Sequence, residues 1–213
     1  MQETESLIGG RFPNALHTSD ILEPGAEPSA DVIAARFKSA EAFIDDIIAD
    51  QARNIPGVIL AGRHDDEFIL PMSFSDLQEK NLFLRIARAL FLDREVQSYT
   101  VISEVSTSTS HGQPQGLGQA PKHKPGVMVL FRTMSRCHMR VYALEHDQDG
   151  LITRLTLTEE HVGEEADESF GGELADLLQP NPTPEMRRAA ASLLKLVSGM
   201  GLVNIELDPM RTR

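Results

Sequence analysis

Cysteine, aromatic residues and long apolar runs are scarce in this sequence, and each shortage excludes a class of protein. The single cysteine, Cys137, rules out an internal disulfide framework and a zinc site built from several cysteines. Tryptophan is absent and tyrosine occurs twice, which argues against a surface that stacks nucleic-acid bases. No apolar run approaches the roughly 20 residues of a membrane-spanning helix, and the first residues lack a secretion signal. We therefore expect a cytoplasmic protein without a membrane partner. A nucleic-acid contact is a third hypothesis, which depends on the basic residues at 121–140 alone.

Motifs of catalysis and of cofactor binding are also missing. The chain has no G-x-S-x-G elbow, no phosphate-binding P-loop and no G-x-G-x-x-G after a predicted strand. Asp147-Gln148-Asp149-Gly150 resembles the start of a calcium loop, but its fifth and twelfth positions are Leu151 and Thr158 instead of ligands. His64-Asp65 lies between two predicted strands, where a turn explains the aspartate. We predict no catalytic residue, no metal site and no cofactor.

The chain does contain enough apolar residues to bury a core, because 41% of its 213 residues are hydrophobic. This content excludes disorder throughout, and the length suits one domain. Glycine and proline without periodicity predict an N-terminal arm at residues 1–28. We expect a single domain at residues 29–207 and a short tail at 208–213.

The charges are distributed unevenly along the chain. The net charge is −12, and residues 145–185 contain twelve acidic residues against one arginine. Residues 121–140 contain five basic residues and no acidic one. This pattern has two interpretations: the acidic segment neutralises a basic hairpin, or the hairpin binds an anion.

Hydrophobic periodicity predicts the secondary structure. Helices are expected from Ser29 to about Arg53, from a capping box at Ser75, and from Thr183 to Gly199. In the first helix one stripe faces the core, formed by Ile33, Phe37, Ala40, Ile44 and Ile47. The side chains expected to face outward are Lys38, Glu41, Asp45 and Asp50. Strands are expected at residues 58–63, 68–72, 98–107, 127–131, 137–144 and 151–157.

Hairpins outnumber strand–helix–strand units in this order, which predicts the α+β class. We expect an antiparallel sheet of five to six strands packed by two or three helices, in the order α-β-β-α-β-β-β-(β)-α. The element order, with IPGVILAG leading into a hairpin, resembles the layout of profilin-like and roadblock-type modules. That resemblance implies a fold and no function.

Several segments are harder to interpret. A long loop is predicted at residues 108–125. Irregular structure is predicted for the acidic residues 159–182, apart from a short helical piece at 173–178. Residues 202–207 predict a short edge strand.

The strand residues suggest a set of binding candidates. Glu104 lies inside a strand, where a carboxylate is either solvated or paired, and Arg132 or Arg140 is its expected partner. His138, Arg140 and Tyr142 alternate on one face of their strand, opposite the face of Cys137.

These candidates support two readings of function. The first is a non-catalytic module, expected to be a homodimer, that binds a protein or peptide through a sheet edge or through the loop at 108–125. The alternative is a small-anion binder or an enzyme that uses Glu104, Arg132, His138 and Arg140.

Overall fold

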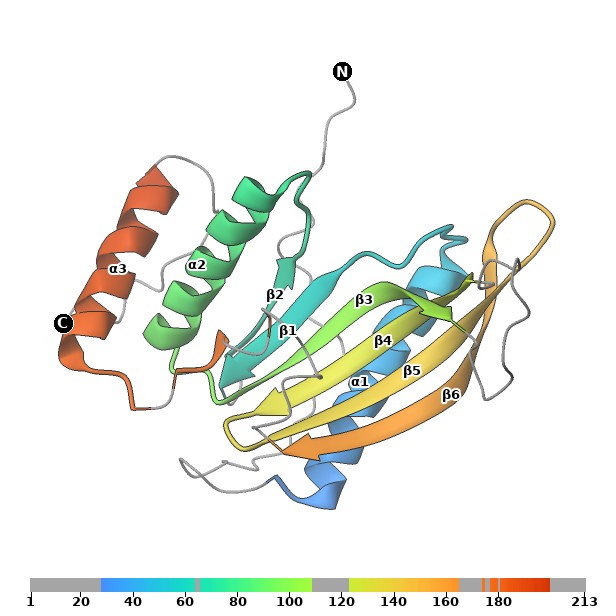
Figure 1. Cartoon of the computed structure of the whole chain (residues 1–213), viewed down its shortest axis with the longest axis horizontal. Helices are drawn as coiled ribbons and strands as arrows, with labels where there is room; N and C mark the ends of the chain where they lie inside the picture. The colour runs from blue at the N-terminus through green and yellow to red at the C-terminus, as the bar shows by residue number, and fades with distance from the viewer. Residues whose placement is uncertain are drawn as a thin grey trace, which may run out of the picture.

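The structure is a computed structural model, and it describes residues 28–63, 66–108, 123–164, 174, 177–179 and 181–199. These residues form a six-stranded antiparallel sheet with three helices (Figure 1). The elements in chain order are α1 (Ala30–Ala49), β1 (Val58–Arg63), β2 (Asp66–Pro71), α2 (Leu77–Asp93), β3 (Ser98–Ser108), β4 (His123–Thr133), β5 (Arg136–His146), β6 (Ile152–Glu164) and α3 (Pro184–Gly199). The predicted α+β fold and its element order are confirmed.

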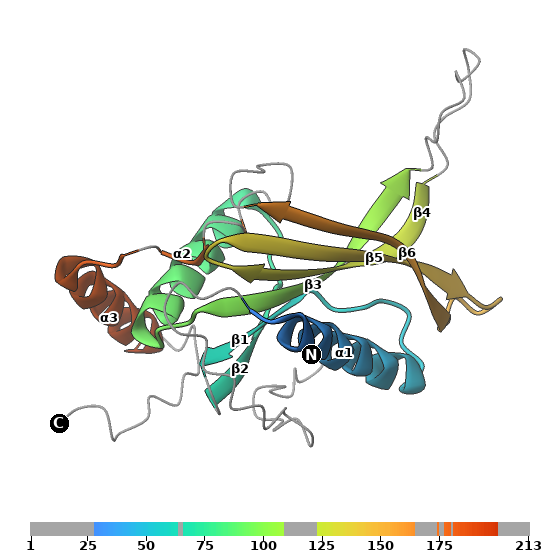
Figure 2. The same cartoon turned by 90° about the horizontal axis from the view of Figure 1, so that it is seen from below.

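The helices pack on different parts of the sheet. The strand order is β2-β1-β3-β4-β5-β6, so β2 and β6 form the two edges. The buried residues of α1 join a core cluster with β3, β4 and β5, whereas those of α2 join a second cluster on the other face. A third cluster joins α3 to α2. Figure 2 shows α1 below the sheet, and α2 and α3 beside the end of the sheet formed by β1 and β2.

The helix α1 forms for the reasons that its sequence indicates. The Ser29 side chain accepts a hydrogen bond from the Val32 amide, and Asp31 lies in the first turn. The helix buries Phe37, Ala40 and Ile44 at spacings of three and four. It ends at Ala49, earlier than the predicted Arg53, because Gln51 adopts a left-handed backbone with φ 60°.

The helix α2 begins one residue later than the predicted capping box. Asp76, and not Ser75, is the N-cap, and its carboxylate accepts hydrogen bonds from the amides of Gln78 and Glu79. The Glu79 carboxylate in turn accepts from the amide and hydroxyl of Ser75. An ionised aspartate followed three residues later by glutamate satisfies more amides than the Ser75–Gln78 pair, which explains the shift.

Two tight turns fix the register of β4, β5 and β6. The Thr133 hydroxyl accepts from the amides of Ser135 and Arg136, which closes the β4–β5 turn. Between β5 and β6, Asp147 accepts from the amides of Asp149 and Leu151. Gly150 has φ +78°, a conformation that costs glycine little. Both predicted hairpins are therefore present.

Two predicted irregular segments are shorter than expected. β3 extends to Ser108 and β4 begins at His123, so strand pairing continues into the loop predicted at 108–125. β6 continues to Glu164, well into the acidic segment predicted as irregular from residue 159. Pairing with the long strand β5 explains this difference, since each added residue gains ladder hydrogen bonds. The arm at residues 1–27 and the strand predicted at 202–207 lie outside the described residues, as does half of the helical piece predicted at 173–178.

Candidate functional site

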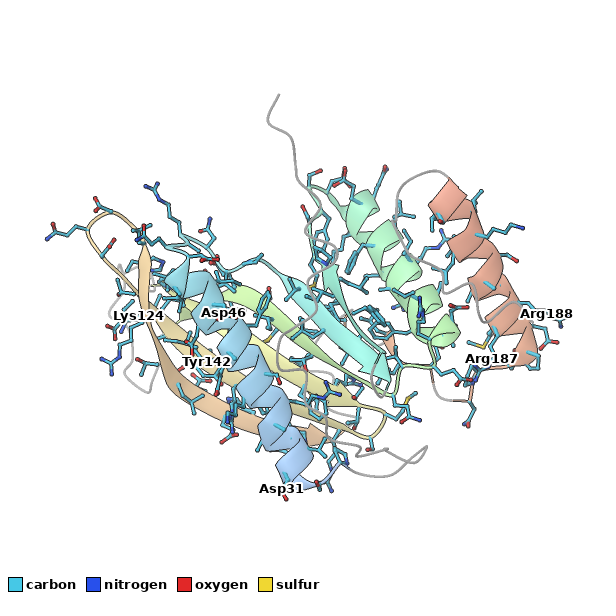
Figure 3. All side chains as sticks on the ribbon, turned by 180° about the vertical axis from the view of Figure 1, so that it is seen from behind. Asp31, Asp46, Lys124, Tyr142, Arg187 and Arg188 are labelled. Carbon is cyan, nitrogen blue, oxygen red and sulfur yellow. The ribbon has the colours of Figure 1, made fainter. Side chains whose placement is uncertain are left out.

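The face of the sheet under α1 contains a polar network that links three elements, α1, β5 and β6. Arg140 and Tyr142 lie on β5, Glu160 on β6, and Glu41 on α1. Glu41 Oε1 accepts hydrogen bonds from the Tyr142 hydroxyl at 2.5 Å and from Arg140 Nη1 at 3.3 Å. Arg140 Nε donates to Glu160 Oε1 at 2.8 Å. Figure 3 shows Tyr142 on the sheet beside α1.

An aromatic ring completes this network. The guanidinium carbon of Arg140 lies 4.2 Å from the centroid of the Phe37 ring, so its charge faces the ring's π electrons. Phe37 itself is buried in the core cluster under α1. Because Phe37 and Glu41 are four residues apart on one helix, both reach the same strand from adjacent turns of α1. We call Phe37, Glu41, Arg140, Tyr142 and Glu160 the α1 network.

The surroundings in the α1 network raise the pKa of both Tyr142 and Arg140. Burial and the neighbouring Glu41 carboxylate raise the pKa of Tyr142 far above its ordinary value, so the phenol stays neutral. Burial acts to lower the pKa of Arg140, but its bonds to Glu160 and Tyr142 outweigh that effect and raise it. Two carboxylates thus surround one guanidinium. The network suits the anchoring of α1 better than the binding of a further anion, because the Arg140 charge is already compensated.

The prediction placed Glu41 on the outer side of α1, and this was wrong. The helical stripe of apolar residues predicts the buried centre of the face, whereas Glu41 lies at its margin, where a carboxylate reaches the sheet. The four-residue spacing from Phe37 to Glu41 indicates that both side chains lie on the side of α1 that faces the sheet. Glu160, the second carboxylate that binds Arg140, was also missed, because the acidic segment was predicted to be irregular instead of part of β6.

Glu104 lies on the same face as the α1 network but has a different partner from the one expected. Its carboxylate accepts a hydrogen bond from the Ile55 amide at 2.7 Å, and not from Arg132 or Arg140. Ile55 precedes β1 in the connection from α1, so the bond ties that connection to β3. The Ile55 amide has no strand partner and needs an acceptor, and the Glu104 carboxylate provides it.

His138 lies two residues before Arg140 on the same face of β5. Its ring is 6.3 Å from that of Phe131, its cross-strand neighbour on β4. His138 is buried, and its neighbour on β6 is Val162. The predicted alternation of His138, Arg140 and Tyr142 on the face opposite Cys137 agrees with the strand register.

Arg132 lies on the other face of the sheet from the remaining candidates. The register pairs Arg132 with Cys137 on β5 and with Tyr99 on β3, and both belong to the core cluster on the α2 side. A tight turn at 133–136 itself implies the pairing of Arg132 with Cys137, so the sequence contained this signal. The structure therefore does not bring Glu104, Arg132, His138 and Arg140 together on one face.

The outer edge of the sheet is a second candidate surface. β6 is the last strand of the sheet, and among the described residues no strand pairs with its outer side. A register shift opposite Val141 and Tyr142 accommodates Thr158, whose hydroxyl donates to the Val141 carbonyl. This bulge places Leu157 and Val162 on the same face, and they are 49% and 62% exposed.

Charges line the same edge. Glu160 lies between Leu157 and Val162 on the α1 face and remains half exposed despite its bond to Arg140. On the opposite face Glu159 contacts His161, with Oε2 and Nε2 3.1 Å apart. We call Leu157, Glu159, Glu160 and Val162 the β6 edge. It combines backbone that pairs with none of the described strands on its outer side, apolar side chains and negative charge.

The described part of the chain contains neither a group of metal-ligating side chains nor a membrane-spanning helix. Within the residues that the structure describes, no group of three or more histidine, cysteine, aspartate or glutamate side chains could hold a metal ion. None of the helices described is long and apolar enough to cross a membrane.

Comparisons of the chain with protein-family models, with curated proteins and with solved structures found no match. The resemblance in element order to profilin-like and roadblock-type modules therefore stays a prediction. Function has to be argued from the residues themselves.

Proposed function

We propose that this protein is a non-catalytic binding module that takes an extended segment of a partner protein along the β6 edge. The observation that supports it most is the outer side of β6, which pairs with none of the described strands and displays two exposed apolar side chains. Only the start of the strand is tied down there, where the Ile152 amide donates to the Ala52 carbonyl. A strand at the edge of a sheet presents N–H and C=O groups that an extended peptide can pair with. Side chains at alternate positions then supply specificity.

The charges of the edge indicate the kind of segment that would bind. Glu159 and Glu160 lie on opposite faces of β6, and both side chains are about half exposed. A bound strand would place its own side chains on both faces, opposite these two carboxylates. An alternating segment can place its apolar residues on the α1 face, beside Leu157 and Val162, and its lysines or arginines on the opposite face, beside Glu159.

A second copy of this chain is another occupant of the same edge, and it would make the predicted homodimer. The same free strand and exposed leucine favour it. Pairing β6 with itself in antiparallel fashion gathers the Glu159 and Glu160 carboxylates of both copies, and like charges across strands repel. A basic segment of another protein meets no such repulsion, so we favour it.

The test is an array of eight-residue peptides that alternate valine with lysine, glutamate or serine, probed with the full chain. We expect retention of the valine–lysine series. The double variant Leu157→Lys and Val162→Lys should lose about 10-fold in affinity, because two exposed apolar contacts become repulsive charges. Thr156→Lys is the matched control, since Thr156 is exposed on the same strand but faces the other side.

Light scattering over a range of protein concentrations identifies the occupant. A monomer that retains valine–lysine peptides supports the proposal. A dimer that the Leu157→Lys and Val162→Lys variant dissociates assigns the edge to a second copy. Equal peptide retention by the double variant and the parent, or no retention at all, contradicts binding at this edge.

A further inference from the structure

We propose, on the basis of the function proposed above, that protonation of His161 weakens the binding of a lysine-bearing segment at the β6 edge. His161 Nε2 lies 3.1 Å from Glu159 Oε2, and Glu159 is the carboxylate of the β6 edge on the face opposite α1. The carboxylate that would attract the segment's lysines is therefore in contact with a histidine. Histidine is the side chain that ordinarily changes its charge between about pH 5 and pH 8.

The geometry of β6 keeps the two side chains together and accessible. Glu159 and His161 are two residues apart on the strand, so both lie on the same face. Their partners on β5 are Val141 and Met139. The side chains of Glu159 and His161 are 51% and 42% exposed. A proton and a lysine of a bound segment can therefore both reach the pair from solvent without a change in the fold.

Other titratable or charged side chains of the described strands β4 to β6 share the face of His161, and α1 packs on the opposite face. Arginine, lysine and glutamate side chains ordinarily keep their charge between pH 5.5 and pH 8. A buried thiol is also present, so the assignment to His161 is tested by substitution. These side chains are Cys137 and Glu145 on β5, Arg154 on β6, and Lys124 and Arg132 on β4.

The charge of His161 decides how strongly Glu159 attracts a cation. A neutral ring donates an N–H to the carboxylate and leaves its negative charge in place, whereas a protonated ring cancels that charge and repels a lysine ammonium. Proton binding and segment binding therefore compete, and by linkage each weakens the other by the same factor. Because the pair is about half exposed, the expected factor is small, about 3-fold in affinity.

The primary test compares the Kd of a capped valine–lysine peptide for the full chain at pH 8 and at pH 5.5, at constant ionic strength. Capping removes the terminal charges of the peptide, and its lysines stay charged throughout this range. We expect binding to be about 3-fold weaker at pH 5.5. A capped valine–glutamate peptide should change in the opposite direction, because a protonated His161 attracts its carboxylates.

Two histidine variants assign the pH dependence. His161→Gln keeps an N–H donor beside Glu159 but cannot be protonated in this range, so its Kd for the valine–lysine peptide should be the same at both pH values. His146→Gln is the matched control, since His146 is an exposed histidine at the other end of β5, where it pairs with Ile152. This control should keep the 3-fold ratio of the parent, about the size expected for an exposed ion pair.

Titration calorimetry at pH 6.5 in two buffers of different ionisation enthalpy measures the competition directly. The parent should release a fraction of a proton when the valine–lysine peptide binds, and His161→Gln should release none. Equal Kd values at both pH values in the parent, or a ratio that persists in His161→Gln, would overturn the role of His161, while retention of the peptide at pH 8 would leave the proposed function standing. No retention at either pH contradicts binding at the β6 edge and the role of His161 with it.

Discussion

The arginines on the two faces of the sheet have different surroundings. Arg140 faces α1, where two carboxylates and an aromatic ring surround it. Arg132, eight residues earlier on the neighbouring strand, faces the α2 side, and no ion pair reaches it within the described ranges. The same residue type thus anchors α1 on one face and has no described ion pair on the other.

The difference originates in what the facing elements supply. α1 brings Glu41 to the sheet, and β6 brings Glu160 to the side of Arg140. The α2 side contributes apolar side chains around Arg132, with Leu130 and Leu177 in the same cluster. An arginine is neutralised only where a neighbouring element provides a carboxylate, so its role depends on the face and not on the residue type.

The largest expected effect on the free energy of unfolding comes from the substitution of Phe37, which packs between α1 and the sheet. Phe37→Ala removes a ring that is 1% exposed and should lower the free energy of unfolding by about 3–5 kcal/mol. Urea unfolding followed by circular dichroism measures it. Phe37→Leu is the control, because it keeps most of the volume and loses mainly the ring under Arg140. A loss below about 1 kcal/mol for Phe37→Ala would contradict the packing of α1 on the sheet.

A smaller effect is expected from Tyr142→Phe, which removes the hydroxyl that donates to Glu41. The expected loss is about 1–2 kcal/mol at neutral pH, since hydrogen bonds to charged groups contribute about that much. The pKa of Tyr142 is raised in the folded state, so folding holds the phenol in its neutral form. This contribution is fully present below the unfolded pKa of about 10 and is lost as the pH rises above it.

The measurement for Tyr142 is the difference in unfolding free energy between the parent and Tyr142→Phe at pH 8 and at pH 11. Using the difference removes the titration of lysines, which both chains share. The parent's advantage should shrink at pH 11. An advantage that stays constant or grows would show that the phenol is not held by Glu41.

The smallest change in unfolding free energy is expected from substitutions of the two arginines, Arg140 and Arg132. Arg140→Met should lower the unfolding free energy by about 1 kcal/mol, a value reduced by the partial exposure of the pair. Arg132→Met should change it by less than about 0.5 kcal/mol, because none of the described ion pairs involves Arg132. A loss for Arg140→Met with no change for Arg132→Met in chemical unfolding supports the contrast between the faces. Equal losses would mean that Arg132 is also paired.

Local patterns were sufficient to predict most of the fold. The stripe through Phe37, Ala40 and Ile44 predicted the buried side of α1, and Asp149-Gly150 predicted the last hairpin. Both signals act over a few residues, where backbone sterics and helical spacing dominate. The predicted capping box placed the N-cap of α2 one residue too early. Ser75 and Asp76 both cap well, and only the position of Glu79 decides between them.

The candidate sites were harder to predict because they depend on contacts between distant segments. Glu104 was expected to meet an arginine, yet it bonds the amide of Ile55, 49 residues away in sequence. Leu157 and Val162 share a face only because Thr158 forms a bulge, and simple alternation would have separated them. A bulge changes the alternation of faces without leaving a mark in the pattern of apolar residues.

By itself the sequence determined where the helices and strands form and which hairpins join them, since these follow from spacing, capping and turn residues that act within a few positions. Only the tertiary structure decided that Glu41 reaches Arg140, that Glu104 accepts from the Ile55 amide, and that β6 is left as an edge. Each of these depends on strand order, register or helix placement, which arise when segments far apart in the chain pack together.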